Sequence, residues 1–164
     1  MVEVIFNFFS GISKEFALFM ISLIPLIEER GALIYAATVN IPWQKALPIC
    51  ILANMLPVPL LLLFGMKIIQ WLKTTKLFGN FFTKYEKKLY SKSDAVKKYG
   101  FWALTIFVGI PIPGTGAWSG TLVATILEFK YKKALLSIFL GVILAGIIMC
   151  IACYGTVGIF KFFA

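Results

Sequence analysis

Long runs of apolar positions dominate the chain, and the polar positions that divide them predict its helices. Residues 46–66 and 134–160 carry no charge and are long enough to cross a bilayer, which takes about 20 residues. Two further apolar stretches, 16–41 and 101–127, are each interrupted near the middle. The pattern predicts an all-α integral membrane protein in which transmembrane helices over 43–70 and 134–160 alternate with two broken segments.

Charged residues interrupt the first broken segment. Glu28, Glu29 and Arg30, the only arginine of the chain, follow an apolar run of about half a spanning length. A re-entrant hairpin, which enters and leaves the membrane on one side, would place these charges at its tip. Ionisable side chains at membrane depth are costly and usually line a path or a site. The alternative is a solvated turn between two short surface helices.

Proline and glycine interrupt the second broken segment, at Pro111, Pro113, Gly114 and Gly116. No continuous helix survives this sequence. Lysine-rich segments lie on both sides of it, and the positive-inside rule places both in the cytoplasm. Residues 101–127 must then double back as a second re-entrant hairpin. The alternative, one broken spanning helix, would leave one lysine cluster outside.

The two halves of the chain share short sequences in the same order. Each break opens with Ile-Pro and is followed by Gly-Ala, and each spanning helix begins with Lys-Ala-Leu. Prolines at 48, 57 and 59 predict kinks in the first spanning helix. We therefore predict two inverted repeats, each a re-entrant helical hairpin plus a kinked transmembrane helix, an arrangement typical of transporters.

Two lysine-containing segments have helical amphipathic patterns outside the spans. Residues 1–15 predict an interfacial helix, and residues 73–98 predict a cytoplasmic lysine-rich amphipathic linker that rests on an anionic leaflet. A binding tail for a soluble partner is the alternative for the linker. Membrane lipids are thus expected partners, and the whole chain, 1–164, is one membrane domain.

Composition excludes several classes of protein. The 164 residues are 60% hydrophobic and 14% charged, whereas soluble domains are about 45–50% apolar and about 25% charged. The net charge of +9 marks topology here, so no nucleic-acid partner is expected. Without histidine, histidine metal sites and Ser-His or Cys-His catalysis are excluded. Three cysteines within apolar runs predict no disulfide framework, and we expect no enzyme activity, metal or cofactor.

Three strings resemble a known family: Glu28–Ala32, Asn54–Pro59 and Ile110–Gly120. They look like the small multi-drug export protein family and, more distantly, the DedA superfamily, whose members have two facing re-entrant hairpins. The resemblance implies a prokaryotic plasma membrane and a transport role. DedA-type proteins are linked with recycling of polyprenyl-phosphate carriers and with proton-dependent drug tolerance. Thr115 and Gly116 stand where the DedA pattern has an arginine.

The sequence therefore predicts an ion- or proton-coupled transporter of a small amphipathic or lipid-like substrate. Arg30 would hold an anionic group with amides near Gly114 and Gly116, Glu28 would be the coupling carboxylate, and Asn54 would bond a broken backbone. The expected site comprises Glu28, Arg30, Gly31, Asn54, Pro111, Pro113, Gly114, Thr115, Gly116 and Trp118. The alternative is a membrane-organising protein that transports nothing, and both monomer and homodimer stay open.

Overall fold

The structure is a computed structural model of the chain. It describes the backbone of residues 13–25, 27–74, 93–112 and 114–163, and their side chains except at 66–74, 93–98 and 156–163. All elements in these ranges are helices, which confirms the predicted all-α class. Most of the predicted interfacial helix, most of the lysine-rich linker and Pro113 lie outside the described residues.

The first helix pair consists of α2 (Lys14–Leu23) and α3 (Glu28–Thr38), which pack against each other. The Ser13 hydroxyl caps α2 by accepting a hydrogen bond from the backbone N–H of Phe16. The helix ends before Pro25, because a proline disfavours helical backbone in the preceding residue. Glu28 opens α3 with a positive φ of 50°, so the acidic residues stand directly at the turn of the pair.

The helices α4 (Trp43–Met55) and α5 (Pro57–Thr74) follow in nearly continuous succession. Helix α4 continues through Pro48, and the break falls at Leu56 instead. Pro57 and Pro59 lie in the first turn of α5, where backbone N–H groups have no intrahelical partner to lose. Pro57 and Pro59, rather than Pro48, therefore set the position of the break between the two helices.

The second helix pair consists of α7 (Ser93–Gly109) and α8 (Ala117–Ile126), and the long α9 (Tyr131–Phe163) follows it. Helix α7 ends just before Pro111, as proline requires. Gly114 turns the chain with a φ of +87°, which side chains rarely allow. Gly116 then caps the N-terminus of α8.

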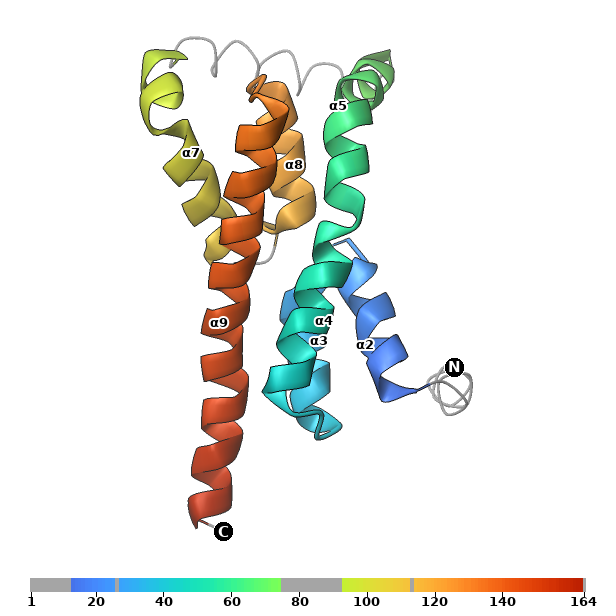
Figure 1. Cartoon of the computed structure of the whole chain (residues 1–164), viewed down its shortest axis with the longest axis vertical. Coiled ribbons are helices and arrows are strands. Elements are labelled where there is room, and N and C mark those ends of the chain that lie inside the picture. The colour runs from blue at the N-terminus through green and yellow to red at the C-terminus, as the bar shows by residue number, and fades with distance from the viewer. Residues whose placement is uncertain (1–12, 26, 75–92, 113, 164) are drawn as a thin grey trace.

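Figure 1 shows the first helix pair beside one half of α9 and the second pair beside the other half. The turns of both pairs lie near the middle of the molecule. Each pair has its own hydrophobic cluster. One cluster joins α2, α3, α4 and the later part of α9, and the other joins α5, α7, α8 and the earlier part of α9. The two long elements, α4–α5 and α9, each contribute to both clusters.

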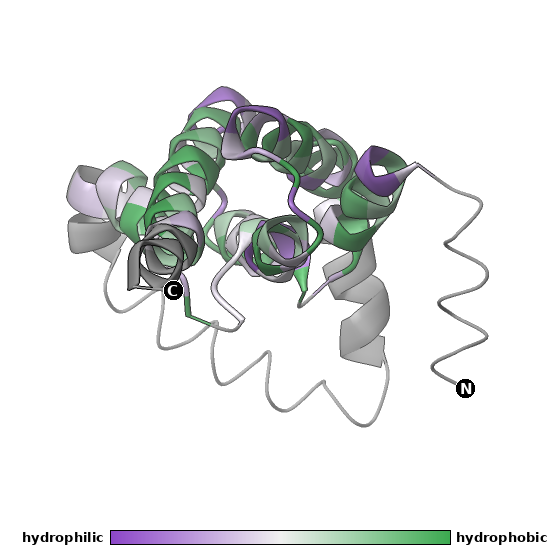
Figure 2. Ribbon diagram, turned by 90° about the horizontal axis from the view of Figure 1, so that it is seen from below, coloured by the Kyte–Doolittle hydropathy of each residue, from purple (hydrophilic) through white to green (hydrophobic). Residues whose placement is uncertain are grey.

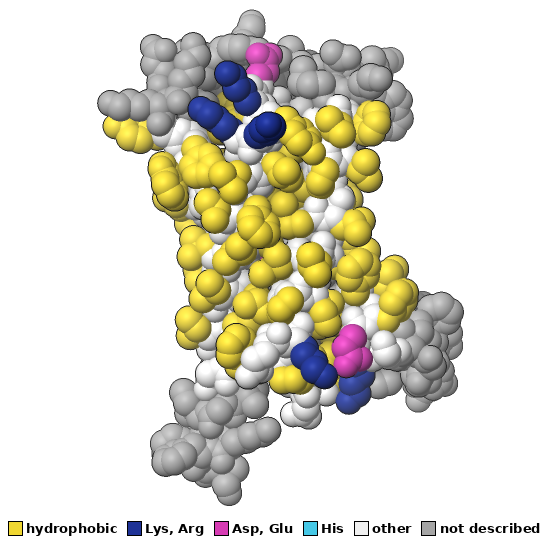
Figure 3. Space-filling view, viewed as in Figure 1, with side chains coloured by type: hydrophobic (Ala, Val, Ile, Leu, Met, Phe, Trp, Pro, Cys, Tyr) yellow, Lys and Arg dark blue, Asp and Glu magenta, His cyan; other side chains and the backbone are white. Residues whose placement is uncertain are grey.

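The outer surface carries a wide hydrophobic zone. Leu52 and Ile151 are 67% and 70% exposed, and many other large apolar side chains are exposed as well. Figure 3 shows this zone between two ends where the charged side chains gather, and Figure 2 shows hydrophobic residues along most of the described helices. Two segments are long and apolar enough to cross a membrane, Trp43–Gly65 and Tyr131–Gly155. This surface is that of a membrane protein.

Candidate functional site

A buried ion pair lies where the two helix pairs meet. Nη1 of Arg30 donates to Oε2 of Glu28 at 2.7 Å, and the side chains are only 11% and 4% exposed. The two residues lie two positions apart in the first turn of α3, at the turn of the first helix pair. Because removing charges from water costs several kcal/mol per ion, this pair needs further partners, and the second helix pair supplies them.

Arg30 binds the C-terminal end of α7. Its Nη2 donates to the carbonyl oxygens of Val108 at 3.0 Å and Ile110 at 3.2 Å, and lies 3.3 Å from the Thr115 hydroxyl. The last carbonyls of a helix lack intrahelical donors and carry partial negative charge. The guanidinium therefore satisfies these acceptors and neutralises that end of the helix.

Glu28 binds the opposite kind of helix end. Its Oε1 accepts a hydrogen bond from the backbone N–H of Trp118, in the first turn of α8, at 3.2 Å. A side chain on Gly116 would overlap the same carboxylate, so the close approach requires glycine. The α8 N-terminus, which the sequence predicts as an anion site, thus holds the Glu28 carboxylate in this structure.

The remaining expected site residues differ in their places. The Thr115 hydroxyl lies 2.8 Å from the carbonyl oxygens of Ile110 and Ile112 and closes the turn of the second pair. A side chain on Gly31 would meet Ile27, so this glycine serves packing within the first pair. Gly114 faces open space, and Pro111 stands in the connection after α7.

Asn54 does not make the expected hydrogen bond to a broken backbone. It is 1% exposed on α4, and neither atom of its amide has a hydrogen-bond partner among the described residues. Nε of Arg30 and Nε1 of Trp118 are likewise buried without a partner in this part of the chain. Unsatisfied buried polar groups cost about 1–3 kcal/mol each, so these atoms remain open to a ligand.

Glu29 was placed at the hairpin tip by the sequence but was not among the expected site residues. It is 1% exposed, and its Oε2 has no hydrogen-bond partner among the described residues. Successive helical residues point about 100° apart, so Glu29 cannot share the direction of Glu28. This difference in direction between two adjacent acids could have identified Glu29 as a separate candidate from the sequence.

These features define a helical membrane protein with a buried ionic contact between two helix pairs. The chain belongs to the family described as "Putative small multi-drug export protein", which matches residues 28–148, more than half of its length. The family name indicates a transporter rather than an enzyme. No curated protein and no solved structure matches the chain. In the described part, no three acidic or cysteine side chains gather as metal ligands.

Proposed function

We propose that the protein exports small amphipathic or lipid-like compounds, which pass between the tips of two re-entrant hairpins. The observation that carries this proposal is the Glu28–Arg30 ion pair, which bonds both helix ends at the turn of the second pair. Charges held at membrane depth usually belong to a transport path. The family name supports export at the same coarse level.

The contacts of the long helices support an inverted-repeat arrangement. Helix α4 packs on the first helix pair and α5 on the second, whereas α9 packs first on α7 and later on α3. Each long element therefore packs on the helix pair that precedes it in the chain with one part and on the other helix pair with its other part. Repeats of opposite orientation would produce this exchange, and their interface is where such transporters bind substrate. In this proposal the two helix pairs are the re-entrant hairpins.

The contact between the pairs would act as the central gate. Substrate can pass only if Arg30 leaves the carbonyls of Val108 and Ile110 and Glu28 leaves the amide of Trp118. Substrate binding would favour the arrangement in which these bonds are broken, because a ligand shifts an equilibrium toward the state that binds it better.

Coupling to protons falls to Glu29 rather than Glu28 in this proposal. Glu28 is paired with Arg30 and bonded to α8, so its charge is compensated. Oε2 of Glu29 has no hydrogen-bond partner among the described residues and lies in an enclosed site, where the neutral acid is favoured over the bare carboxylate. A group that gains and loses a proton with changes in its surroundings can link transport to a proton gradient.

Flux through reconstituted vesicles tests the function. We expect the protein to move a cationic dye such as ethidium, or a polyprenyl phosphate, faster with a pH gradient than without one. Arg30→Gln should lower this flux by more than about tenfold, because the gate loses both its charge and its hydrogen bonds. Leu136→Trp, an exposed change on α9 far from the contact, should leave it unchanged. Wild-type protein that moves neither compound would contradict export and favour the membrane-organising alternative.

A further inference from the structure

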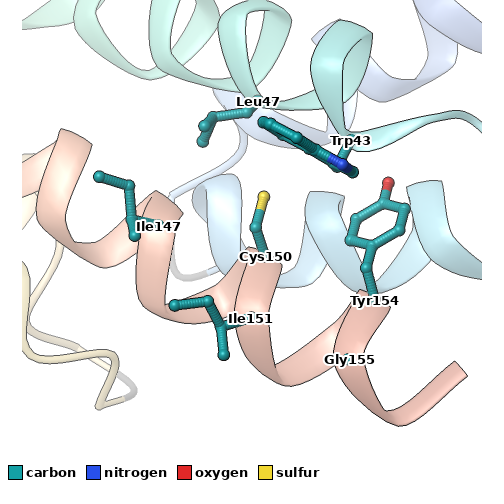
Figure 4. A pocket seen from close by; sticks show the side chains of 7 residues that line it. All are labelled: Trp43, Leu47, Ile147, Cys150, Ile151, Tyr154 and Gly155. Carbon is teal, nitrogen blue, oxygen red and sulfur yellow. The ribbon is translucent and has the colours of Figure 1, made fainter. Parts of the chain in front are cut away.

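A lateral apolar groove lies between α4 and the later part of α9. Its volume is about 430 Å³, and Figure 4 shows side chains of both helices around it. The lining is Trp43, Leu47, Ile147, Cys150, Ile151, Tyr154 and Gly155. The Tyr154 hydroxyl donates to the carbonyl oxygen of Ile41 at 2.8 Å, which ties this part of α9 to the segment before α4. This hydrogen bond helps to hold the two sides of the groove in place.

The buried carboxyl of Glu29 lies near two residues that line this groove, Leu47 and Cys150. A side chain on Gly146 would contact both Leu47 and Oε2 of Glu29. Leu47 also lines the groove, so one leucine side chain stands between the apolar space and the carboxyl. The glycine therefore lets Leu47 and the carboxyl of Glu29 pack close to the backbone of α9.

Among the described side chains, no lysine or arginine lines the groove near Glu29. Arg30, on the same helix, is bonded to Glu28 and to α7. The other ionisable groups around the carboxyl are Glu28, Cys50 on α4 and Cys150 on α9. Helix α2 contributes the buried Ser22 near Cys50. Among the described side chains, the site therefore combines an apolar space with an acid whose Oε2 has no hydrogen-bond partner, and no lysine or arginine lines it.

We propose that the groove binds a lipophilic cation, with its apolar body on Ile147, Ile151 and Trp43 and its charge facing Glu29. This inference names the substrate class and rests on the proposed export function for its role. The indole face of Trp43 adds a cation–π surface. Displacement of Leu47 brings the cation to the carboxyl, and the proton of Glu29 leaves as the cation binds. A cation and a proton thus compete for one carboxylate.

Tetraphenylphosphonium and tetraphenylborate test the charge preference, because they have nearly the same shape and opposite charge. Equilibrium binding to the full chain in detergent should show tetraphenylphosphonium bound at least about tenfold more tightly. Its affinity should rise with increasing pH, because proton loss from Glu29 creates the counter-charge. Equal binding of both ions would show a lipid-like apolar surface and would overturn the proposal.

Two variants with matched controls locate the binding. Glu29→Gln should lower tetraphenylphosphonium affinity about tenfold and abolish its pH dependence, whereas Glu15→Gln, at an exposed acid of α2, should change neither. Ile151→Trp should fill the groove and weaken binding similarly. Ile151 is 70% exposed, so this change does not disturb the core. Leu136→Trp, on the same helix outside the groove, is its control.

The outcomes separate this inference from the proposed function. Unchanged cation binding in both Ile151→Trp and Glu29→Gln would overturn the groove site, even if vesicles still show flux. A dimer that Ile151→Trp converts to a monomer would show that a second copy occupies the groove, and would also overturn it. Absence of all flux with intact cation binding would contradict export and leave the binding site standing.

Discussion

Arg30 donates a hydrogen bond to the carbonyl oxygen of Val108 across 3.0 Å, although 78 positions separate the two residues in the chain. With the Glu28–Trp118 bond, it places a positive side chain at the negative end of α7 and a negative side chain at the positive end of α8. The dipoles of the second helix pair and the charges of the first are therefore complementary. This match explains how two charges are tolerated deep in an apolar protein.

Replacing Arg30 by lysine should weaken the contact although it keeps the charge. An ammonium group cannot present the guanidinium fork that reaches Glu28 and α7 together. We expect a loss of about 1–3 kcal/mol in unfolding free energy, measured by denaturant titration in detergent, and at least about tenfold slower vesicle flux. Leu136→Trp serves as the control. Full stability together with full flux would contradict the role of the fork.

A methyl group at Gly116 should separate the two helix pairs. Gly116→Ala forces the Glu28 carboxylate away from the N-terminus of α8, since no space exists between them. The expected result is destabilisation of about 2–4 kcal/mol, because the buried ion pair loses the hydrogen bond from the backbone N–H of Trp118. Gly155→Ala on α9 meets nothing within 4 Å and should not destabilise. Equal melting temperatures for these two variants would argue against the Glu28 contact.

Surface labelling should place both ends of the second helix pair on one side of the membrane. In a cysteine-free background, Asp94→Cys, before most of α7, and Lys130→Cys, just after α8, should react from the same side. Gln44→Cys, at the start of α4, should react from the other. An impermeant maleimide applied to oriented vesicles makes the measurement. Reaction of positions 94 and 130 from opposite sides would mean that α7 and α8 together cross the membrane.

Local sequence signals predicted the positions of the helices and of several helix ends. The uncharged run ending in Phe160 forms a helix, since a backbone in an apolar setting must satisfy its own hydrogen bonds. Pro25 and Pro111 end helices for steric reasons that act between neighbours. The prolines of the first spanning segment were harder to interpret, because α4 accommodates Pro48 and breaks only at Leu56. Which proline bends a helix depends on the packing around it.

The sequence by itself determined that the chain is a helical membrane protein with two interrupted segments, because run lengths, prolines and charges act locally. Only the tertiary structure decided what the charges contact. Most of the partners that Glu28 and Arg30 find on the second helix pair are backbone groups 78 to 90 positions away, and backbone groups leave no signature in the residue types. The same fold turned Glu29 toward α9 and left its Oε2 without a hydrogen-bond partner in the described part of the chain. Direction around a helix and burial by distant segments, rather than composition, separate these two adjacent acids.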